Sequence, residues 1–329
     1  MTRHSKSVGQ QLLSRRRFAI TALGGLGGMF AVCRGSATPG PDGEKIFLNY
    51  DEAGLDAAYD QREWADNISD VYARLDTRNV AVLAELGEPE RHAYGSGPLE
   101  GLDWYRSDRP DAPIHVYFHG GAWGWGDARS NAFIAGPSVN AGAHVVIPDY
   151  VKVIDVDGNL LPLGEQCREA VAWVYRNADK FNADRDRILV SGHSAGGHLA
   201  GVVLTTDWNE FDLPADVVKQ GLLVSGMYDL YPVSLSSRNE YLSFTEEIIA
   251  ALSPFRHLDH LNAQVVVAFG TKESPEFQRQ SLEFFSALRR EGKSASLIEA
   301  TGMNHFEILE NIGEANGVVG HAAIELMGL

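Results

Sequence analysis

The stretch that decides the fold is "RILVSGHSAGGHLAGVVLTT", residues 187–206. The apolar run at 187–190 predicts a strand, and the apolar stretch after Gly196 predicts a helix. Between them, residues 192–196 fit the pattern G-x-S-x-G with Ser194 at the centre. Glycines on both sides permit a sharp strand-to-helix turn that strains the serine backbone and exposes its hydroxyl. The stretch predicts a nucleophilic serine in an α/β fold, although the pattern alone also fits an ordinary glycine-rich turn.

The chain around this stretch alternates short apolar runs with amphipathic ones. Residues 164–181 and 277–291 carry apolar residues at helical spacing. Residues 47–85 are expected to be helical and to lie across one end of the sheet, and residues 229–260 are expected to form a small helical cap. The runs that predict strands are "GLDWYRS", "PIHVYFHG", "AHVVIPDY", "RILVSGH", "GLLVSG", "AQVVVAFG" and "SASLIEA". This alternation predicts an α/β fold, with a mostly parallel central sheet and helices on both faces.

A second glycine-rich segment, "FHGGAWGWG" at residues 118–126, follows the expected strand "PIHVY". An acyl-transfer enzyme must stabilise a developing oxyanion, and backbone N–H groups at the end of a strand can do so. The candidates are the N–H groups of Gly120, Gly121 and Ala122, together with that of Ala195. The alternative is a turn held by a buried Trp123. Two such segments in this order favour the catalytic interpretation.

A base and an acid are expected in the chain order serine, acid, histidine. His305, in "GMNHFEIL", follows the last expected strand, where a loop can bring it toward Ser194. The loop after "AQVVVAFG" contains Glu273 and Glu276 but no aspartate. We prefer Glu273 as the acid because it lies nearer the end of the strand, with Glu276 as the second candidate. The acid would hold the tautomer of His305 and stabilise the imidazolium.

The other histidines predict no metal site. His193 and His198 are five positions apart and do not share a helix face, and His257 and His260 are expected in a loop. The sequence contains no HExxH, no cysteine cluster, no P-loop and no GxGxxG after a first strand. We therefore expect neither a metal nor a cofactor.

The net charge of the chain limits the classes of molecule that it can bind. The formal net charge is -16, and residues 1–37 hold six basic residues and no acidic one, so the rest carries 22 basic against 44 acidic residues. Such a surface repels phosphate backbones and anionic lipids. We therefore expect no nucleic acid as a partner and no stable membrane association. The sequence leaves open whether the chain forms a homo-oligomer.

Residues 1–37 are interpreted as a twin-arginine-type export signal. The segment "SRRRFAI" resembles the twin-arginine motif, and the apolar stretch at 18–32 is about 15 residues long, shorter than the ~20 that span a bilayer. Small residues for cleavage stand at Gly35 and Ala37; an uncleaved anchor or a basic tail is the alternative. The exported protein, periplasmic or secreted, would be a single domain at 38–329 with Cys167 as its one cysteine and no intramolecular disulfide.

Taken together, "HGGAW", "GHSAGGH", "LVSGMYDL", "ESPEFQRQS" and "NHFEILE" resemble the arylformamidase (kynurenine formamidase) branch of the α/β-hydrolases. The resemblance runs from about Leu55 to the C-terminus, and "SPEFQRQSLEFF" is its more specific marker because most esterases of this fold lack it. It implies an α/β-hydrolase fold in which Ser194 is the nucleophile, His305 the general base, and the amides of "HGGAW" and Ala195 the oxyanion hole. Glu273 stands where this family usually has an aspartate.

The resemblance implies a serine hydrolase that removes a formyl group from an aromatic amine through an acyl-enzyme. Trp123 and Tyr228 are expected to narrow the acyl pocket, and Trp125 and Phe306 to contact the aromatic leaving group. The alternatives are a carboxylesterase or a carbamate or amide hydrolase acting on small aryl esters. An alternative of another class is a non-catalytic binding module on the same fold, but such modules usually lose the nucleophile or the histidine.

Overall fold

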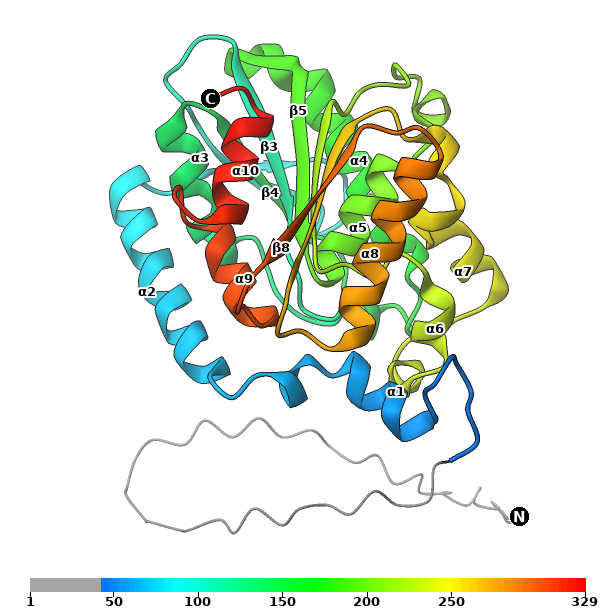
Figure 1. Ribbon diagram of the computed structural model, residues 1–329. Helices are drawn as coiled ribbons and strands as arrows, with labels where there is room; N and C mark the ends of the chain where they lie inside the picture. The colour runs from blue at the N-terminus through cyan, green and yellow to red at the C-terminus, as the bar shows by residue number, and fades with distance from the viewer. Residues whose placement is uncertain (1–42) are drawn as a thin grey trace, which may run out of the picture. The chain divides into compact units, whose positions relative to one another are not determined.

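The computed structural model describes residues 43–329, so the expected export signal at residues 1–37 lies outside the described residues. The described chain forms one eight-stranded sheet in the order β1-β2-β4-β3-β5-β6-β7-β8 (Figure 1). β2 is antiparallel to both of its neighbours, whereas β4, β3, β5, β6, β7 and β8 all run parallel. The strands are β1 (Glu90–Ala93), β2 (Gly101–Tyr105), β3 (Ala112–Phe118), β4 (His144–Pro148), β5 (Ala183–His193), β6 (Gln220–Val224), β7 (Gln264–Gly270) and β8 (Ala295–Ala300).

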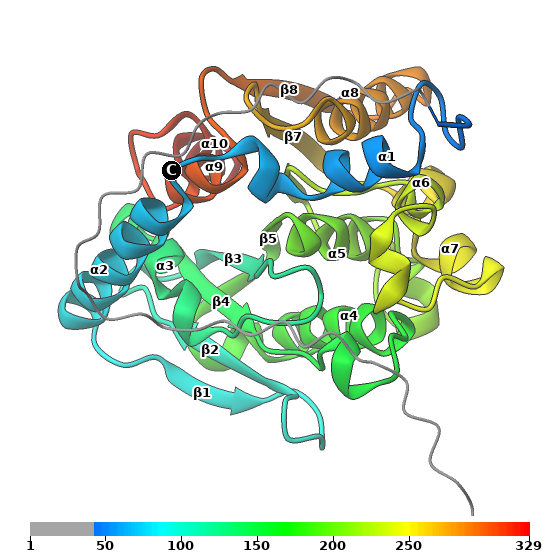
Figure 2. The same ribbon diagram turned by 90° about the horizontal axis from the view of Figure 1, so that it is seen from below.

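Helices cover both faces of the sheet. The α-helices of the described residues are α1 (Glu52–Tyr59), α2 (Ile68–Leu86), α3 (Ala135–Ala141), α4 (Leu161–Asn177), α5 (Ala195–Leu204), α6 (Leu230–Ser234), α7 (Glu246–Leu252), α8 (Pro275–Arg290), α9 (His305–Ile312) and α10 (Val318–Leu326). Figure 2 shows α4, α5 and α8 on one face and α2, α3, α9 and α10 on the other. The predicted mostly parallel sheet between two helical layers is confirmed.

Short 3₁₀ helices connect many of these elements. They are η1 (Gln61–Trp64), η2 (Arg129–Ile134), η3 (Val153–Asp155), η4 (Ala178–Phe181), η5 (Trp208–Phe211), η6 (Ser237–Glu240), η7 (Pro254–Arg256) and η8 (Leu258–His260). Between β6 and β7 the chain forms α6, η6, α7, η7 and η8 in succession, which is the small helical cap expected at residues 229–260. No helix in the described range 43–329 is long and apolar enough to cross a membrane.

Side chains that point alternately to the two faces of the sheet form two apolar cores, one on each face. In β3, Ile114, Val116 and Phe118 belong to the core under α4, α5 and α8, whereas Tyr117 belongs to the core under α3, α9 and α10. Successive side chains of a strand point to opposite faces, so a strand buried on both sides is mostly apolar. This is why β6, β7 and the C-terminal part of β5 are nearly continuous apolar runs, whereas β3 also holds the buried His115, whose ring is hydrogen-bonded to Ser138 and Ser191.

Two elements differ from the sequence-based expectation. β1 was not predicted because its sequence, "ERHA", is polar and it lies largely exposed at the edge of the sheet. Residues 47–85 form helices as predicted, but only α1 lies at one end of the sheet (Figure 1). α2 instead packs on one face against α3 and α9, because Val71 and Leu75 give it a buried apolar side.

The turn between β5 and α5 is packed too tightly for side chains at its glycines. A Cβ atom on Gly192 would lie 2.1 Å from the Gly196 carbonyl oxygen. A Cβ on Gly196 would lie 2.0 Å from the Phe118 carbonyl oxygen at the end of β3. Real Cβ atoms do not approach backbone this closely, so α5 begins directly against β3 only because both positions are glycine.

We predict that Gly196→Ala destabilises the protein by about 3 kcal/mol or more, because the added methyl group forces β3 and α5 apart. The control is Gly124→Ala, whose Cβ would have its nearest neighbour, Ile154 Cγ2, at 3.8 Å. Urea unfolding followed by circular dichroism measures both variants. Equal unfolding midpoints for the two variants would contradict the packing argument.

Candidate active site

Ser194 stands at the end of β5 in a strained backbone conformation. Its φ is 58° and its ψ is -124°, a combination that a non-glycine residue rarely adopts. Its N–H donates to the Val224 carbonyl oxygen at 3.0 Å, which ties the turn to β6. The residue is partly exposed, and Oγ forms no hydrogen bond within residues 43–329. Ser194 is therefore held rigidly by its backbone while its hydroxyl stays available.

The "HGGAW" segment lies directly against Ser194. A Cβ on Gly120 would lie 3.4 Å from Ser194 Cβ. Gly121, Ala122 and Trp123 follow with φ of 114°, 48° and 60°, so three successive residues take left-handed conformations. Such a sequence of conformations turns neighbouring N–H groups toward one side of the chain, which favours anion binding.

The amides proposed for an oxyanion hole are free to bind a ligand. Within the described part of the chain, no hydrogen bond is formed by the N–H of Gly120, Gly121 or Ala122. Ala195 is the first residue of α5, so its N–H has no acceptor within the helix. The "HGGAW" segment contacts Ser194 and Ala195 follows it, and N–H groups so placed can stabilise the oxyanion that forms on a carbonyl oxygen when a serine hydroxyl attacks it.

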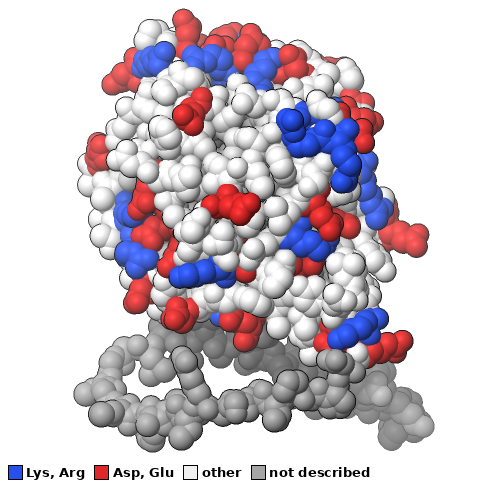
Figure 3. Space-filling model, viewed as in Figure 1, with Lys and Arg blue, Asp and Glu red and all other residues white. Residues whose placement is uncertain are grey.

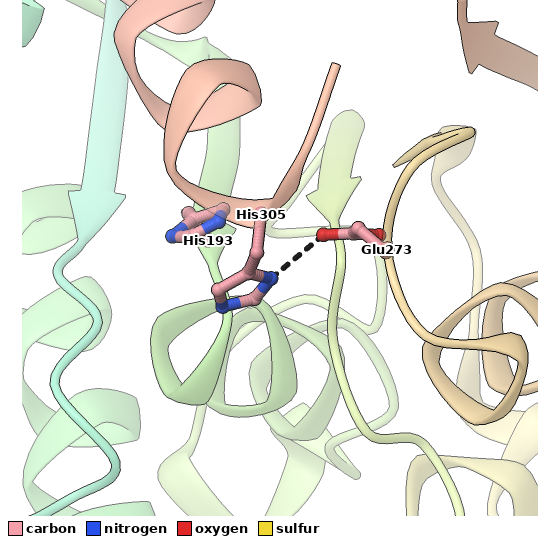
Figure 4. A group of neighbouring side chains, drawn as sticks. All are labelled: His193, Glu273 and His305. Carbon is pink, nitrogen blue, oxygen red and sulfur yellow. Dashed lines mark hydrogen bonds and ion pairs between the residues drawn. The ribbon is translucent and has the colours of Figure 1, made fainter. Parts of the chain in front are cut away.

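Glu273 and His305 meet through a direct hydrogen bond. Glu273 Oε1 lies 2.7 Å from His305 Nδ1, and both side chains are buried (Figure 4). A carboxylate only accepts hydrogen bonds, so this contact places the proton on Nδ1 and leaves Nε2 as the acceptor of the ring. Nε2 forms no hydrogen bond with any described residue.

The loops that carry these two side chains are bound to each other. Lys272 N–H donates to the Met303 carbonyl oxygen at 2.9 Å, and Thr271 N–H to that of Ala300 at 3.2 Å. These bonds join the loop after β7 to the loop after β8. Because adjacent parallel strands end at the same edge of the sheet, residues 32 positions apart in the chain come into contact.

His305 is fixed from several sides. It is the first residue of α9, and the Asn304 side chain before it accepts from two N–H groups of the first turn, Phe306 and Glu307, at 3.0 Å each. The ring of His305 lies 4.9 Å from that of Phe277 and 4.4 Å from that of His193, centroid to centroid. His193 directly precedes Ser194, so the ring of His305 lies beside the turn that carries the serine.

Burial is the main cause of the pKa shifts of Glu273 and His305. It raises the pKa of the Glu273 carboxyl, opposed by the nearby Ser225 and His193 and by the N–H of Gly270, which donates to Oε2 at 3.2 Å. Burial lowers the pKa of His305, and the positive charge of Arg238 lowers it further. Both shifts disfavour charge on the buried groups. They favour a neutral imidazole, which is the form that can act as a base.

One group of side chains has the composition of a metal site. The donor atoms of His193, Glu273 and His305 lie within 4.8 Å of one another (Figure 4), and two imidazoles with one carboxylate can bind Zn²⁺. A metal at this point would have to displace the proton that joins His305 to Glu273. The absence of a metal, which we expect from the sequence, stays a prediction.

The family assignment follows from residues that surround this site. A family model described as BD-FAE matches residues 102–288, a range that includes the "HGGAW" segment, Ser194 and Glu273. The chain belongs to the BD-FAE family. His305 lies beyond the matched range and is assigned to the site by its contact with Glu273.

Individual relatives agree with this assignment. The kynurenine formamidase of Danio rerio is 35% identical over 242 residues, which cover 71% of this chain and 80% of the relative. That of Salmo salar is 33% identical over 243 residues, with the same coverage of 71% and 80%. The esterase LipC of Mycobacterium tuberculosis is 27% identical over 261 residues, 70% of this chain and 62% of LipC. The predicted resemblance is confirmed, and this BD-FAE chain is a hydrolase.

Solved structures confirm the α/β-hydrolase fold. A crystal structure of a Silicibacter protein matches with a TM-score of 0.70 at 22% identity, covering 84% of this chain and 99% of that one. The esterase LipW of Mycobacterium marinum matches with a TM-score of 0.63 at 19% identity, covering 80% of this chain and 90% of LipW.

Glu276, the second candidate acid, belongs to a different part of this BD-FAE chain. Its side chain is fully buried and accepts from Tyr59 OH at 2.8 Å and from Arg279 Nε at 2.8 Å. Tyr59 is the last residue of α1, so the network joins α1 to the start of α8. Glu276 has these two partners and forms no hydrogen bond or ion pair with His305.

The four residues expected to contact substrate lie in different environments. Trp123 is 2% exposed and donates from Nε1 to His198 Nδ1 at 3.1 Å. Tyr228 has no exposed surface, and its ring stacks on Phe284 at 4.3 Å, so it forms part of the core in this structure. Trp125 is 62% exposed, and Phe306 packs edge-on against the ring of His305 at 5.6 Å.

Two side chains beside the site had no role in the sequence analysis. His193 was considered only as a metal ligand, whereas its ring lies against His305 and its Nε2 is buried without a hydrogen-bond partner. Arg238, in η6, lies with its guanidinium carbon 5.8 Å from the ring centre of Trp123. The position of His193 inside "GHSAGGH" was a usable signal, but nothing in the sequence around Arg238 points to the site.

We predict that the two glutamates have opposite mutant phenotypes. Glu273→Ala should lower kcat roughly 10⁴-fold, because His305 loses the group that orients its ring, with little change in stability. Glu276→Ala should lower the free energy of unfolding by about 3 kcal/mol or more, since it leaves Arg279 without its buried partner, while the folded protein keeps its kcat. Steady-state kinetics and urea unfolding measure the two effects. A larger loss of kcat in Glu276→Ala would contradict the assignment of the acid.

Proposed function

We propose that this chain is a serine hydrolase that removes a formyl or other small acyl group from an aromatic amine or aryl ester. The observation that carries the proposal is the 2.7 Å hydrogen bond between Glu273 and His305, beside a serine held in a strained turn. A histidine oriented by a buried carboxylate next to a partly exposed serine is the arrangement that activates a nucleophile. The kynurenine formamidases among the relatives support the formyl group as the acyl part.

In the first half of the proposed reaction, Ser194 Oγ attacks the carbonyl carbon and His305 Nε2 takes the hydroxyl proton. Negative charge then develops on the carbonyl oxygen. The free N–H groups of the "HGGAW" segment and of Ala195 stabilise it. Glu273 stabilises the imidazolium that forms. His305 next gives its proton to the departing amine or phenol, which leaves the acyl group on Ser194.

In the second half, a water molecule replaces the leaving group. His305 takes a proton from the water, whose oxygen attacks the acyl carbon of the ester formed with Ser194. The same N–H groups stabilise the second tetrahedral intermediate. The intermediate collapses to a carboxylic acid, which is formate for a formyl substrate, and His305 returns the proton to Ser194.

The second candidate is a carboxylesterase acting on small aryl esters. It is favoured by the esterase LipC among the relatives, although LipC is less similar than the formamidases. The two functions share one mechanism and differ in the acyl group and the leaving atom. Activity against a series of acyl groups therefore separates them.

We predict that formyl substrates are cleaved faster than longer acyl substrates. The assay compares N-formylkynurenine and formanilide with aryl acetates and butyrates, using kcat/KM and formate release. Ser194→Ala serves as the control and should lower kcat by about 10⁶-fold, the loss measured when a serine nucleophile is removed. A preference for acetyl or butyryl esters would favour the carboxylesterase, and equal rates for wild type and Ser194→Ala on every substrate would refute both.

We also predict that Arg238→Gln moves the low-pH limb of the kcat/KM profile to higher pH. The charged and titratable groups around His305 are Glu273 after β7, His193 in β5 and Arg238 in η6. The protonated form of His305 cannot act as a base, so the rate falls as the pH drops through its pKa. Arg238 lowers that pKa, so removing its positive charge raises the pKa and the fall begins at higher pH.

The control for the pH profile is Arg256→Gln, which removes one positive charge from an exposed position in η7. Its profile should match that of the wild type. A shift of Arg238→Gln toward lower pH would show that the base is not within the field of Arg238.

A further inference from the structure

His198 is a buried histidine of α5, and both nitrogens of its ring have partners. Its Nδ1 accepts from Trp123 Nε1 at 3.1 Å, and its Nε2 lies 2.7 Å from the Leu252 carbonyl oxygen. A carbonyl oxygen only accepts hydrogen bonds, so the ring proton is on Nε2 and Nδ1 keeps the lone pair that the indole N–H needs. Burial lowers the pKa of His198 to about 4, so the ring is neutral at neutral pH.

The contact between these two rings lies inside the protein. On the face shown in Figure 3, basic and acidic side chains lie next to one another at the surface, where water also reaches them. His198, in contrast, has no exposed surface, and Trp123 is 2% exposed. A buried polar group that loses its partner finds no water to replace it, which is costly. The indole N–H is therefore held on His198 as long as the protein is folded.

Trp123 ends the strained part of the segment that carries the free amides. Gly121, Ala122 and Trp123 all have positive φ, and for the two non-glycine residues this conformation is unfavourable by itself. Strained backbone persists only where its surroundings determine it. Two contacts of Trp123 do so here: its carbonyl oxygen accepts from the Val153 N–H at 3.0 Å, and its indole donates to His198.

The bond to His198 also joins the two parts of the proposed oxyanion hole. The first part is the "HGGAW" segment, and the second is the N–H of Ala195, the first residue of α5. His198 lies in the first turn of the same helix, and its N–H donates to the Ser194 carbonyl oxygen at 3.0 Å. The indole of Trp123 is therefore fixed relative to Ser194 and Ala195. Leu252, the other partner of the ring, ends α7 in the cap.

We propose that His198 is a positioning residue for the oxyanion hole and acts through Trp123. By holding the indole, it keeps residues 121–123 in their left-handed conformation and so fixes the direction of their N–H groups. The inference rests on the proposed function, in which His198 neither touches the substrate nor moves a proton. An oxyanion hole that loses its alignment stabilises the transition state less, so kcat should fall while KM is retained.

The chain contains a second pair of the same kind, which serves as the matched control. Trp104 Nε1 donates to His144 Nδ1 at 3.2 Å, and neither residue has exposed surface. The ring centroids lie 5.7 Å apart, against 5.3 Å for Trp123 and His198. This pair joins β2 to β4 and has no contact with the "HGGAW" segment through this bond. Its loss should affect stability alone.

The first test removes the indole N–H and keeps an aromatic ring. Trp123→Phe should lower kcat for 4-nitrophenyl acetate about ten- to hundredfold, the range for displaced catalytic groups, with little change in KM. His198→Leu removes the acceptor and should lower kcat by a similar factor. The double variant should lose no more than either single variant, because all three lack the same bond. Trp104→Phe should keep the wild-type kcat, and urea unfolding shows that each variant is folded in the assay.

Three results of this test would overturn the inference. One is a wild-type kcat in folded Trp123→Phe. Another is an equal loss of kcat in Trp104→Phe, which would trace the loss to destabilisation in general. The third is a double variant whose loss is the product of the two single losses, since the two residues would then act separately.

A second test is independent of the acyl substrate and uses diethyl 4-nitrophenyl phosphate. Ser194 Oγ forms a bond to phosphorus, the bond from phosphorus to the phenolate oxygen breaks, and the serine proton passes to His305. The phosphoryl oxygen then takes the place of the carbonyl oxygen in the oxyanion hole. The rate constant for release of one equivalent of 4-nitrophenolate should fall about tenfold or more in Trp123→Phe and stay unchanged in Trp104→Phe.

This second test separates the inference from the proposed function. The expected fall in Trp123→Phe supports the inference even if the wild type hydrolyses no formyl or acyl substrate, a result that would refute the proposed function alone. Equal rate constants in the wild type and Trp123→Phe overturn the inference alone. A wild-type protein that does not react with the phosphate ester and hydrolyses no acyl substrate would refute both.

Discussion

The strained backbone of Ser194 is the constraint on which the rest of the site depends. A non-glycine residue in such a conformation costs on the order of 1–3 kcal/mol, and it persists only where its surroundings determine it. Here the Ser194 N–H is bound to β6 and the following glycine, Gly196, lies against the end of β3. The three central strands therefore hold the serine. The same contact brings the "HGGAW" segment, which follows β3, to within van der Waals distance of it.

The parallel arrangement of the strands brings the remaining groups to the same edge. Glu273 follows β7 and His305 follows β8, and the two loops are bound through Met303 and Ala300. Arg238 comes from the cap between β6 and β7 and is held by α1. In open α/β sheets, ligands bind at the carboxyl ends of the strands because the loops meet there. The polar groups described above come from five such connections, those that follow β3, β5, β6, β7 and β8.

Much of this arrangement follows from local sequence patterns. Strands buried on both faces, such as β6 and β7, are mostly apolar and were predicted, as was the glycine-flanked serine. The edge strand β1 was not predicted, because a polar exposed strand lacks the apolar pattern that identifies the others. The contact of Glu273 with His305 was expected from chain order alone, and its 2.7 Å distance required the structure.

Arg238 and Tyr228 show what local patterns omit. Arg238 lies in a polar segment of the cap, and only the packing of the cap against α1 and Trp123 brings it to the site. Tyr228 follows a strand end, which favours a site residue, yet it stacks on Phe284 of α8 and has no exposed surface. Both outcomes depend on contacts between segments that are distant in the sequence, and no single stretch of the chain encodes them.

The bonds between α1 and α8 also constrain the order in which the chain folds. Gln61 donates to Ser274 Oγ at 2.8 Å across 213 positions, and Tyr59 donates to Glu276 across 217. α1 leaves the ribosome early, but its buried partners are synthesised only in the last quarter of the chain. Arg238 depends on the end of α1 in turn. The nascent protein therefore cannot complete the site during most of its synthesis, and contacts of such long range are expected to form late and slowly.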